Sequence, residues 1–134
     1  MRLNPEERNI VVELEADKAR STFAEVEVLR QAGLWNNLAG RLYYAAFHAV
    51  SALLVSEGHF VGTHQGAMVQ FHKYFVKTGM LTKEEGALYS QLQTLREKSD
   101  YNCSYSATED EIVPRIAATG MFIDKVLGLI KNNP

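Results

Sequence analysis

Apolar residues recur three and four positions apart along most of the chain, whereas no long stretch alternates between apolar and polar residues. The first spacing places apolar side chains on one face of an α-helix, and the second would be needed for a half-buried strand. The pattern therefore predicts an all-α fold in which each amphipathic helix buries one face.

Two long helices are predicted in the first part of the chain. Asn4, followed by a proline and two glutamates, is typical of a helix start, and Gly33 is placed to end that helix. The second helix should run from about Leu34 to Glu57, with Gly58 in the left-handed conformation at its end. Because this helix is apolar on most of its circumference, we expect it to be central or shared with a partner. Its inward rows are Leu38, Leu42, Ala45, Ala49 and Leu53, and beside them Tyr43, Phe47, Val50 and Leu54.

Three further helices are predicted from the residues that begin them. Thr63 can cap a third helix that Gly79 ends. A capping box spans Thr82–Glu85 before the fourth helix, and Thr108 begins a similar signature before the fifth. Pro114 lies inside the fifth pattern, so that helix either kinks there or begins just before it.

Five amphipathic helices joined by short loops form an antiparallel bundle by default. No internal repeat, low-complexity tract or linker divides the chain, so residues 1–134 are expected to form a single domain. Lengths of this order bury roughly two thirds of the unfolded surface, which is enough for a core without disulfides or a structural metal.

Charge and cysteine content narrow the function classes. Sixteen acidic residues nearly balance fourteen basic ones, so any contact with RNA has to be local. The single cysteine, Cys103, excludes an intrachain disulfide and favours a reducing compartment. The first residues lack the apolar core of a signal peptide, and the most apolar charge-free run, between Arg41 and Glu57, is shorter than the ~20 residues of a membrane span. We therefore expect a cytoplasmic protein that does not enter a membrane.

The end of the fourth predicted helix carries one candidate site. Arg96 and Asp100 are four positions apart, so their side chains can meet on one face of the helix. Two interpretations remain open. In one, Arg96 compensates an aspartate that opposes the helix dipole, and the pair is structural. In the other, the planar guanidinium contacts a phosphate or a transition state, with Tyr101 and Asn102 beside it.

A second candidate lies on the second predicted helix, where Arg41, Tyr44 and His48 share one stripe. Such tyrosines and histidines usually satisfy their polar tips inside a bundle, although His48 could also serve as an acid or base. The other histidines, at 59, 64 and 72, lack the spacing of a metal-binding pair, and no cofactor motif is present. His64 is assigned to the start of the third helix.

Several short segments, in this order along the chain, resemble the HEPN domain family in its branch of small bacterial and archaeal proteins. The likeness runs from about Ala16 to Ile130. The segments are Arg41–Ala49 (RLYYAAFHA), Thr63–Gly66 (THQG), Phe75–Gly79 (FVKTG) and Leu95–Tyr101 (LREKSDY).

This resemblance implies a helical bundle that dimerises, with a cleft between subunits where an Arg-x(4-6)-His motif cleaves RNA without a metal. Many relatives are toxins encoded beside a minimal nucleotidyltransferase, which is the antitoxin and can adenylylate a tyrosine near the motif. By position, Arg96 matches the motif arginine. The histidine is not matched, because Tyr101, Asn102 and Cys103 stand where it would fall.

The missing imidazole argues against efficient cleavage, because a tyrosine with an ordinary pKa near 10 is a poor proton acceptor at neutral pH. Asp100 would replace it only if burial raised its pKa, and Tyr101 or Tyr105 remains a candidate for modification. The spacing of Arg41 and His48 also fits the motif but falls on the wrong helix.

The leading hypothesis is a homodimeric HEPN-type component of a nucleotidyltransferase-linked toxin-antitoxin or defence system. RNA or a nucleotide would bind at a dimer cleft lined by Arg96, Asp100 and Tyr101, and the second predicted helix would supply core and dimer contacts. The alternative hypothesis is a non-catalytic interaction module in which Arg96 and Asp100 form a structural pair. A small-molecule enzyme working inside the bundle is least favoured.

Overall fold

The computed structural model describes residues 3–131, and α-helices with one π-helical turn account for all the regular secondary structure there. The elements are α1 (Pro5–Ala24), α2 (Val26–Ala32), α3 (Trp35–Ser56), α4 (His64–Phe71), the π-helical turn η1 (His72–Val76), α5 (Lys83–Tyr101) and α6 (Glu109–Gly128). With α1–α2 as one bent rod and α4–η1 as another, the described part has five rods. The predicted all-α fold is confirmed. The ends of the predicted domain, residues 1–2 and 132–134, lie outside the described residues.

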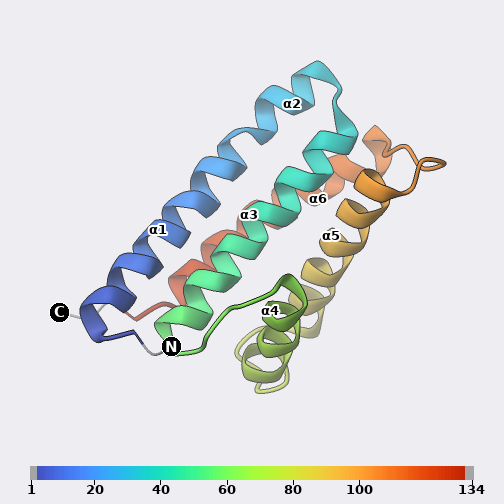
Figure 1. Ribbon diagram of the computed structural model, residues 1–134. Helices are drawn as coiled ribbons and strands as arrows, with labels where there is room; N and C mark the ends of the chain where they lie inside the picture. The colour runs from blue at the N-terminus through green and yellow to red at the C-terminus, as the bar shows by residue number, and fades with distance from the viewer. Residues whose placement is uncertain (1–2, 132–134) are drawn as a thin grey trace.

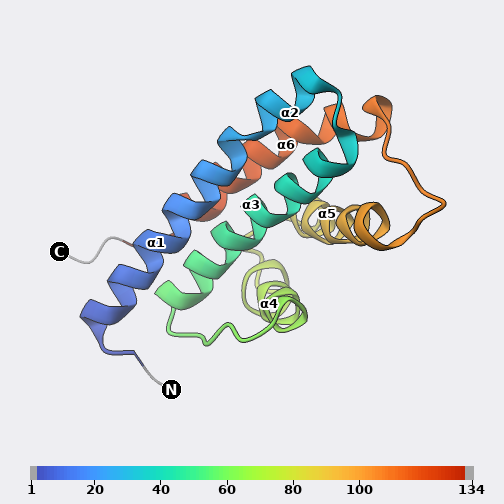
Figure 2. The same ribbon diagram turned by 45° about the horizontal axis from the view of Figure 1, so that its top comes forward.

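Helix α3 lies at the centre, in contact with α1, α2, α4, α5 and α6 (Figure 1). Helices α1 and α3 lie side by side and run in opposite directions, while α6 packs on α3 and runs with it. Helix α5 crosses α3 obliquely on the other side, which a second view shows most clearly (Figure 2). The neighbouring pairs α1–α3 and α5–α6 thus each run in opposite directions within the all-α bundle (Figure 1).

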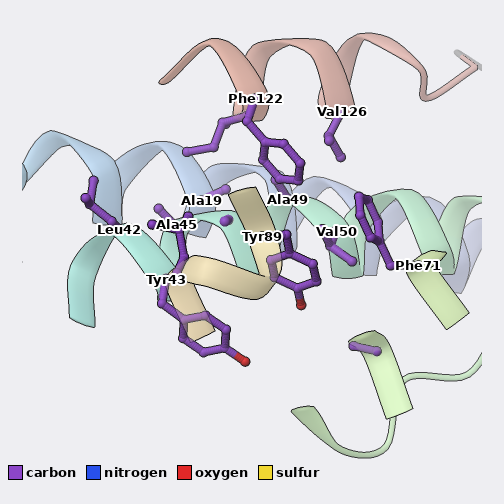
Figure 3. Close-up of a cluster of buried hydrophobic side chains, with 14 of the residues drawn as sticks. Ala19, Leu42, Tyr43, Ala45, Ala49, Val50, Phe71, Tyr89, Phe122 and Val126 are labelled. Atoms are coloured by element: carbon purple, nitrogen blue, oxygen red, sulfur yellow. The ribbon is translucent and has the colours of Figure 1, made fainter. Parts of the chain in front are cut away.

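The core is built from the two predicted rows of α3. All members of these rows are buried except Phe47, which is half-buried. Tyr43 and Tyr89 stack with ring centroids 6.2 Å apart, and Phe122 of α6 stacks on the other side of Tyr89 (Figure 3). Helix α3, which includes Arg41, is long and apolar enough to span a membrane by length and composition alone, but 72% of the tested window is buried inside the bundle. Its apolar character is therefore explained by its central position.

The predicted helix ends are confirmed by their caps. Asn4 and Thr82 each form a capping box, with Glu7 and Glu85 respectively. The hydroxyls of Thr63 and Thr108 accept hydrogen bonds from backbone N–H groups three residues later. Gly33 and Gly58 have φ angles of 70° and 85°, the left-handed conformation that lets the chain leave α2 and α3.

Three details differ from the predicted helices. The first helix does not run unbroken to Gly33, because at Glu25 the backbone N–H shifts to a tighter hydrogen bond with the Thr22 carbonyl. The third helix becomes a π-helical turn after Phe71, and Phe75 within this wider turn is again buried. Helix α6 starts well before Pro114 and continues through it. Of the two candidates for its inward position, Phe122 is buried and Met121 is exposed.

Candidate functional site: an arginine held among tyrosines

Arg96 of α5 reaches across to α3 and is surrounded by aromatic rings. Its Nη2 donates a hydrogen bond of 2.9 Å to the Tyr44 hydroxyl. Its Cζ lies 5.4 Å from the ring centroid of Tyr43, 5.2 Å from that of Tyr44 and 5.7 Å from that of Tyr101. The side chain is only 14% exposed. We call Arg41, Tyr43, Tyr44, Arg96 and Tyr101 the arginine–tyrosine cluster.

The surroundings of Arg96 keep it charged. Burial acts to lower the pKa of the guanidinium, but the hydrogen bond with Tyr44 and the nearby Tyr101 and Asp100 raise it overall. The Asp100 carboxylate lies 3.6 Å from Nε, as the four-residue spacing predicts. That distance is an ion pair rather than a hydrogen bond, and Nε itself is buried without a hydrogen-bond partner among the described residues.

The other predicted residues of the cluster are on its outer side. The guanidinium of Arg41 lies 5.4 Å from the Tyr44 ring centroid, so Tyr44 has an arginine from α3 and another from α5 near its ring. Arg41 is paired at 3.8 Å with Glu25, which lies at the bend between α1 and α2. The Tyr101 side chain is exposed at the end of α5. The structure therefore brings Arg41, Tyr44, Arg96, Asp100 and Tyr101 together.

Two predicted site residues have other contacts. The Nδ1 atom of His48 is hydrogen-bonded at 3.0 Å to the Glu15 carboxylate, so His48 faces α1 rather than Arg96. Asn102 accepts a hydrogen bond from the backbone N–H of Ser104 through its side chain, which stabilises the turn after α5. These contacts give both residues a local structural role.

Sequence reasoning missed His64 as a member of this site. It is the first residue of α4, as predicted, but its Nδ1 is also hydrogen-bonded at 2.8 Å to the Tyr43 hydroxyl. Burial, Arg96 and His48 together lower the pKa of His64. Burial raises the pKa of Tyr43 to about 12, although Arg96 opposes this effect. The repeated aromatic residues of Arg41–Ala49 were the available signal, since a buried phenol needs a hydrogen-bond partner.

Two pockets, of about 550 and 740 Å³, lie elsewhere on the chain, and Arg8 lines both of them. In residues 3–131 there is no group of three or more His, Cys, Asp and Glu side chains placed to hold a metal ion. What the arginine–tyrosine cluster offers is a fixed cation among aromatic faces, an arrangement suited to an anion attached to a planar group.

Comparison with known proteins identifies the family. The model of the HEPN domain matches residues 12–129. The chain belongs to the HEPN domain family. The resemblance of its short segments to that family is thus confirmed, and the match covers most of the helical bundle.

The curated relatives of this HEPN protein are similar over nearly their whole length. A UPF0332 protein of Thermotoga maritima is 29% identical over 94% of this chain and 96% of its own. A protein of Methanocaldococcus jannaschii with the name "Putative toxin" is 29% identical over 84% of each chain. A UPF0332 protein of Archaeoglobus fulgidus is 25% identical over 91% of this chain and 97% of its own.

Proposed function

We propose that this HEPN protein has a toxin-like role and binds RNA or a nucleotide through Arg96. The observation that carries the proposal is the set of unused donors on a guanidinium that is held rigidly and kept charged. Of its five N–H groups, one donates to Tyr44 and the one on Nε is buried, whereas no residue among 3–131 is hydrogen-bonded to Nη1. A phosphate accepts two parallel hydrogen bonds from such a fork. Relatives with the name "Putative toxin" support the role.

Tyr101 supports the choice of a nucleotide-containing ligand. Its ring is exposed, beside Arg96, at the end of α5. Exposed aromatic rings next to a phosphate-binding arginine stack on unpaired bases, and this stacking is tolerant of base identity. Tyr101 therefore supplies a surface for the base, while Arg96 binds the phosphate.

A second copy of the chain would complete the site. Tyr101, whose ring lies beside Arg96, is exposed at the end of α5, so this edge of the site faces solvent in the single chain. In a homodimer joined near the end of α5, the second copy would supply the other wall of a cleft. A minimal nucleotidyltransferase is the proposed protein partner, and a small nucleotidyltransferase gene beside this one would support that pairing. A chain that remains monomeric at micromolar concentration in sedimentation equilibrium would contradict the dimer.

The central test replaces Arg96 and measures binding, folding and toxicity together. In Arg96→Ala, we expect the affinity for a fluorescein-labelled single-stranded RNA oligonucleotide to fall about 10-fold or more, since hydrogen bonds to charged groups contribute about 1.5–3 kcal/mol. The growth defect caused by expression should disappear, while the circular dichroism spectrum stays the same. Arg20→Ala is the matched control, because Arg20 is paired with Asp124 on the exposed surface.

The same variant distinguishes the alternative function. If Arg96→Ala lowers the melting temperature but leaves RNA binding and toxicity unchanged, the pair with Asp100 is structural. The protein would then be an interaction module rather than an RNA- or nucleotide-binding one.

A further inference from the structure

The His64 imidazole is fixed at one nitrogen and free at the other. Its Nδ1 is bonded to the Tyr43 hydroxyl, and its ring packs on Phe47 with centroids 4.2 Å apart. Within the described part of the chain, Nε2 has no hydrogen-bond partner, and the side chain is only half-buried. A histidine oriented through one nitrogen, with the other accessible, has the arrangement of a proton acceptor or donor.

His64 and Arg96 border the same two rings, although they come from α4 and α5. His64 lies 5.7 Å from the Tyr43 ring centroid and 5.9 Å from that of Tyr44. Arg96 lies 5.4 and 5.2 Å from the same two centroids. The imidazole and the guanidinium thus border the same pair of rings, and the charge of Arg96 is close enough to help lower the pKa of His64. The phenol oxygens of Tyr43 and Tyr89 point to one side of the core, away from Phe122 (Figure 3).

Every neighbouring group that shifts the pKa of His64 lowers it. Burial is the largest cause of its lowered pKa, followed by Arg96 and His48. His48 is itself paired with Glu15 of α1, and Asp100 lies beside Arg96 on α5. The imidazole is therefore neutral at pH 7, which is the form that accepts a proton.

We propose that His64 is the general base that cleaves an RNA strand bound at Arg96. The inference rests on the proposed function. Nε2 takes the proton of a ribose 2′-hydroxyl, and the 2′-oxygen forms a bond to the adjacent phosphorus. The bond from phosphorus to the 5′-oxygen breaks, and that oxygen takes a proton from water while His64 returns its proton to the solvent. The products are a 2′,3′-cyclic phosphate and a 5′-hydroxyl. Arg96 stabilises the negative charge on the phosphate oxygens during the step.

This assignment explains how the site could work without a histidine after Arg96 on α5. Tyr101, Asn102 and Cys103 follow there, and none of them carries an imidazole. In this proposal His64, at the start of α4, takes the role of the missing histidine.

The test is single-turnover cleavage of a labelled single-stranded RNA oligonucleotide by the full chain and by His64→Gln. We expect the variant to cleave about 100-fold more slowly, the lower bound for loss of a general base, with its dissociation constant changed less than about 2-fold. His59→Gln is the matched control, because His59 stacks on Tyr74 outside the cluster. This variant should cleave at the wild-type rate. The wild-type rate should rise with pH and level off at a pKa below 6.5, and His64→Gln should lack this inflexion.

Two further measurements distinguish a failure of the His64 proposal from loss of folding and from a failure of the proposed function. Free imidazole should restore part of the rate to His64→Gly, a result that loss of folding could not give, and an all-deoxy oligonucleotide should not be cleaved. An unchanged rate in His64→Gln, or RNA binding without cleavage by the wild type, overturns the role of His64 and leaves the proposed function standing. Absence of RNA binding by the wild type overturns the proposed function itself.

Discussion

At the scale of single residues, Tyr43 links the core to the candidate site. Its ring is fully buried against Tyr89, while its hydroxyl is bonded to His64. Removing the phenol from water disfavours its ionised form, which is why its pKa rises to about 12. The same burial makes the position of His64 dependent on a side chain that cannot move without disturbing the core.

The raised pKa of Tyr43 predicts how stability depends on alkaline pH. A group whose folded pKa exceeds the unfolded value of 10 contributes stability fully below pH 10, and that contribution is lost as pH rises through about 12. The free energy of unfolding of the wild type should therefore fall relative to Tyr43→Phe over this range. Urea titrations of both proteins at several pH values measure the difference, and a constant difference between pH 9 and 11.5 would contradict the prediction.

The site was predicted in part because some of its contacts are local. Arg96 and Asp100 are four residues apart on one helix, so their pairing follows from helix geometry alone. His64 and Tyr43 are 21 residues apart and meet only because α4 folds back on α3. No spacing rule predicts a contact that depends on tertiary packing, so the sequence places His64 only at a helix start.

At the scale of elements, α5 packs closely on the π-helical turn at Gly86. A Cβ atom there would lie 2.9 Å from Cγ2 of Val76 and 3.0 Å from Cε1 of His72, whose ring is bonded to Ser90 and cannot move freely. We expect Gly86→Ala to destabilise the protein by about 1–3 kcal/mol, as overpacked sites do.

Gly40→Ala, in the middle of α3, is the matched control. Nothing outside its own helix lies within 4 Å of the added Cβ, so only the helix propensity changes and stability should rise by up to about 1 kcal/mol. Chemical denaturation of the two variants gives the comparison. A stabilised Gly86→Ala would show that α5 and η1 are not packed as described.

Helix ends were predicted well, and the internal irregularities were not. Caps such as Thr82 depend on hydrogen bonds to residues three positions away, so the sequence contains all the necessary information. The π-helical turn at His72–Val76 places both Phe71 and Phe75 in the core, and the other elements determine that arrangement. The bend at Glu25 has no comparable sequence signal, because its backbone remains in the right-handed helical region.

At the scale of the whole molecule, the net charge of −2 gives no general attraction for nucleic acid. The proposed RNA binding would therefore depend on a few local cations, and Arg41 and Arg96 are the two that flank Tyr44. Each phosphate neutralised on a single strand contributes about −0.7 to the slope of log affinity against log salt concentration. Two contacts per site should therefore give a shallow slope of about −1.4.

Fluorescence anisotropy with a labelled single-stranded RNA oligonucleotide, repeated across a series of salt concentrations, measures this slope. We expect Arg96→Ala and Arg41→Ala each to reduce its magnitude by about 0.7, because each removes one phosphate contact. Arg20→Ala should leave the slope unchanged, since Arg20 is paired with Asp124 away from the cluster. A slope steeper than about −3, or one unaffected by Arg96→Ala, would mean that the RNA contacts another surface. The arginine–tyrosine cluster would then have to bind something other than a phosphate.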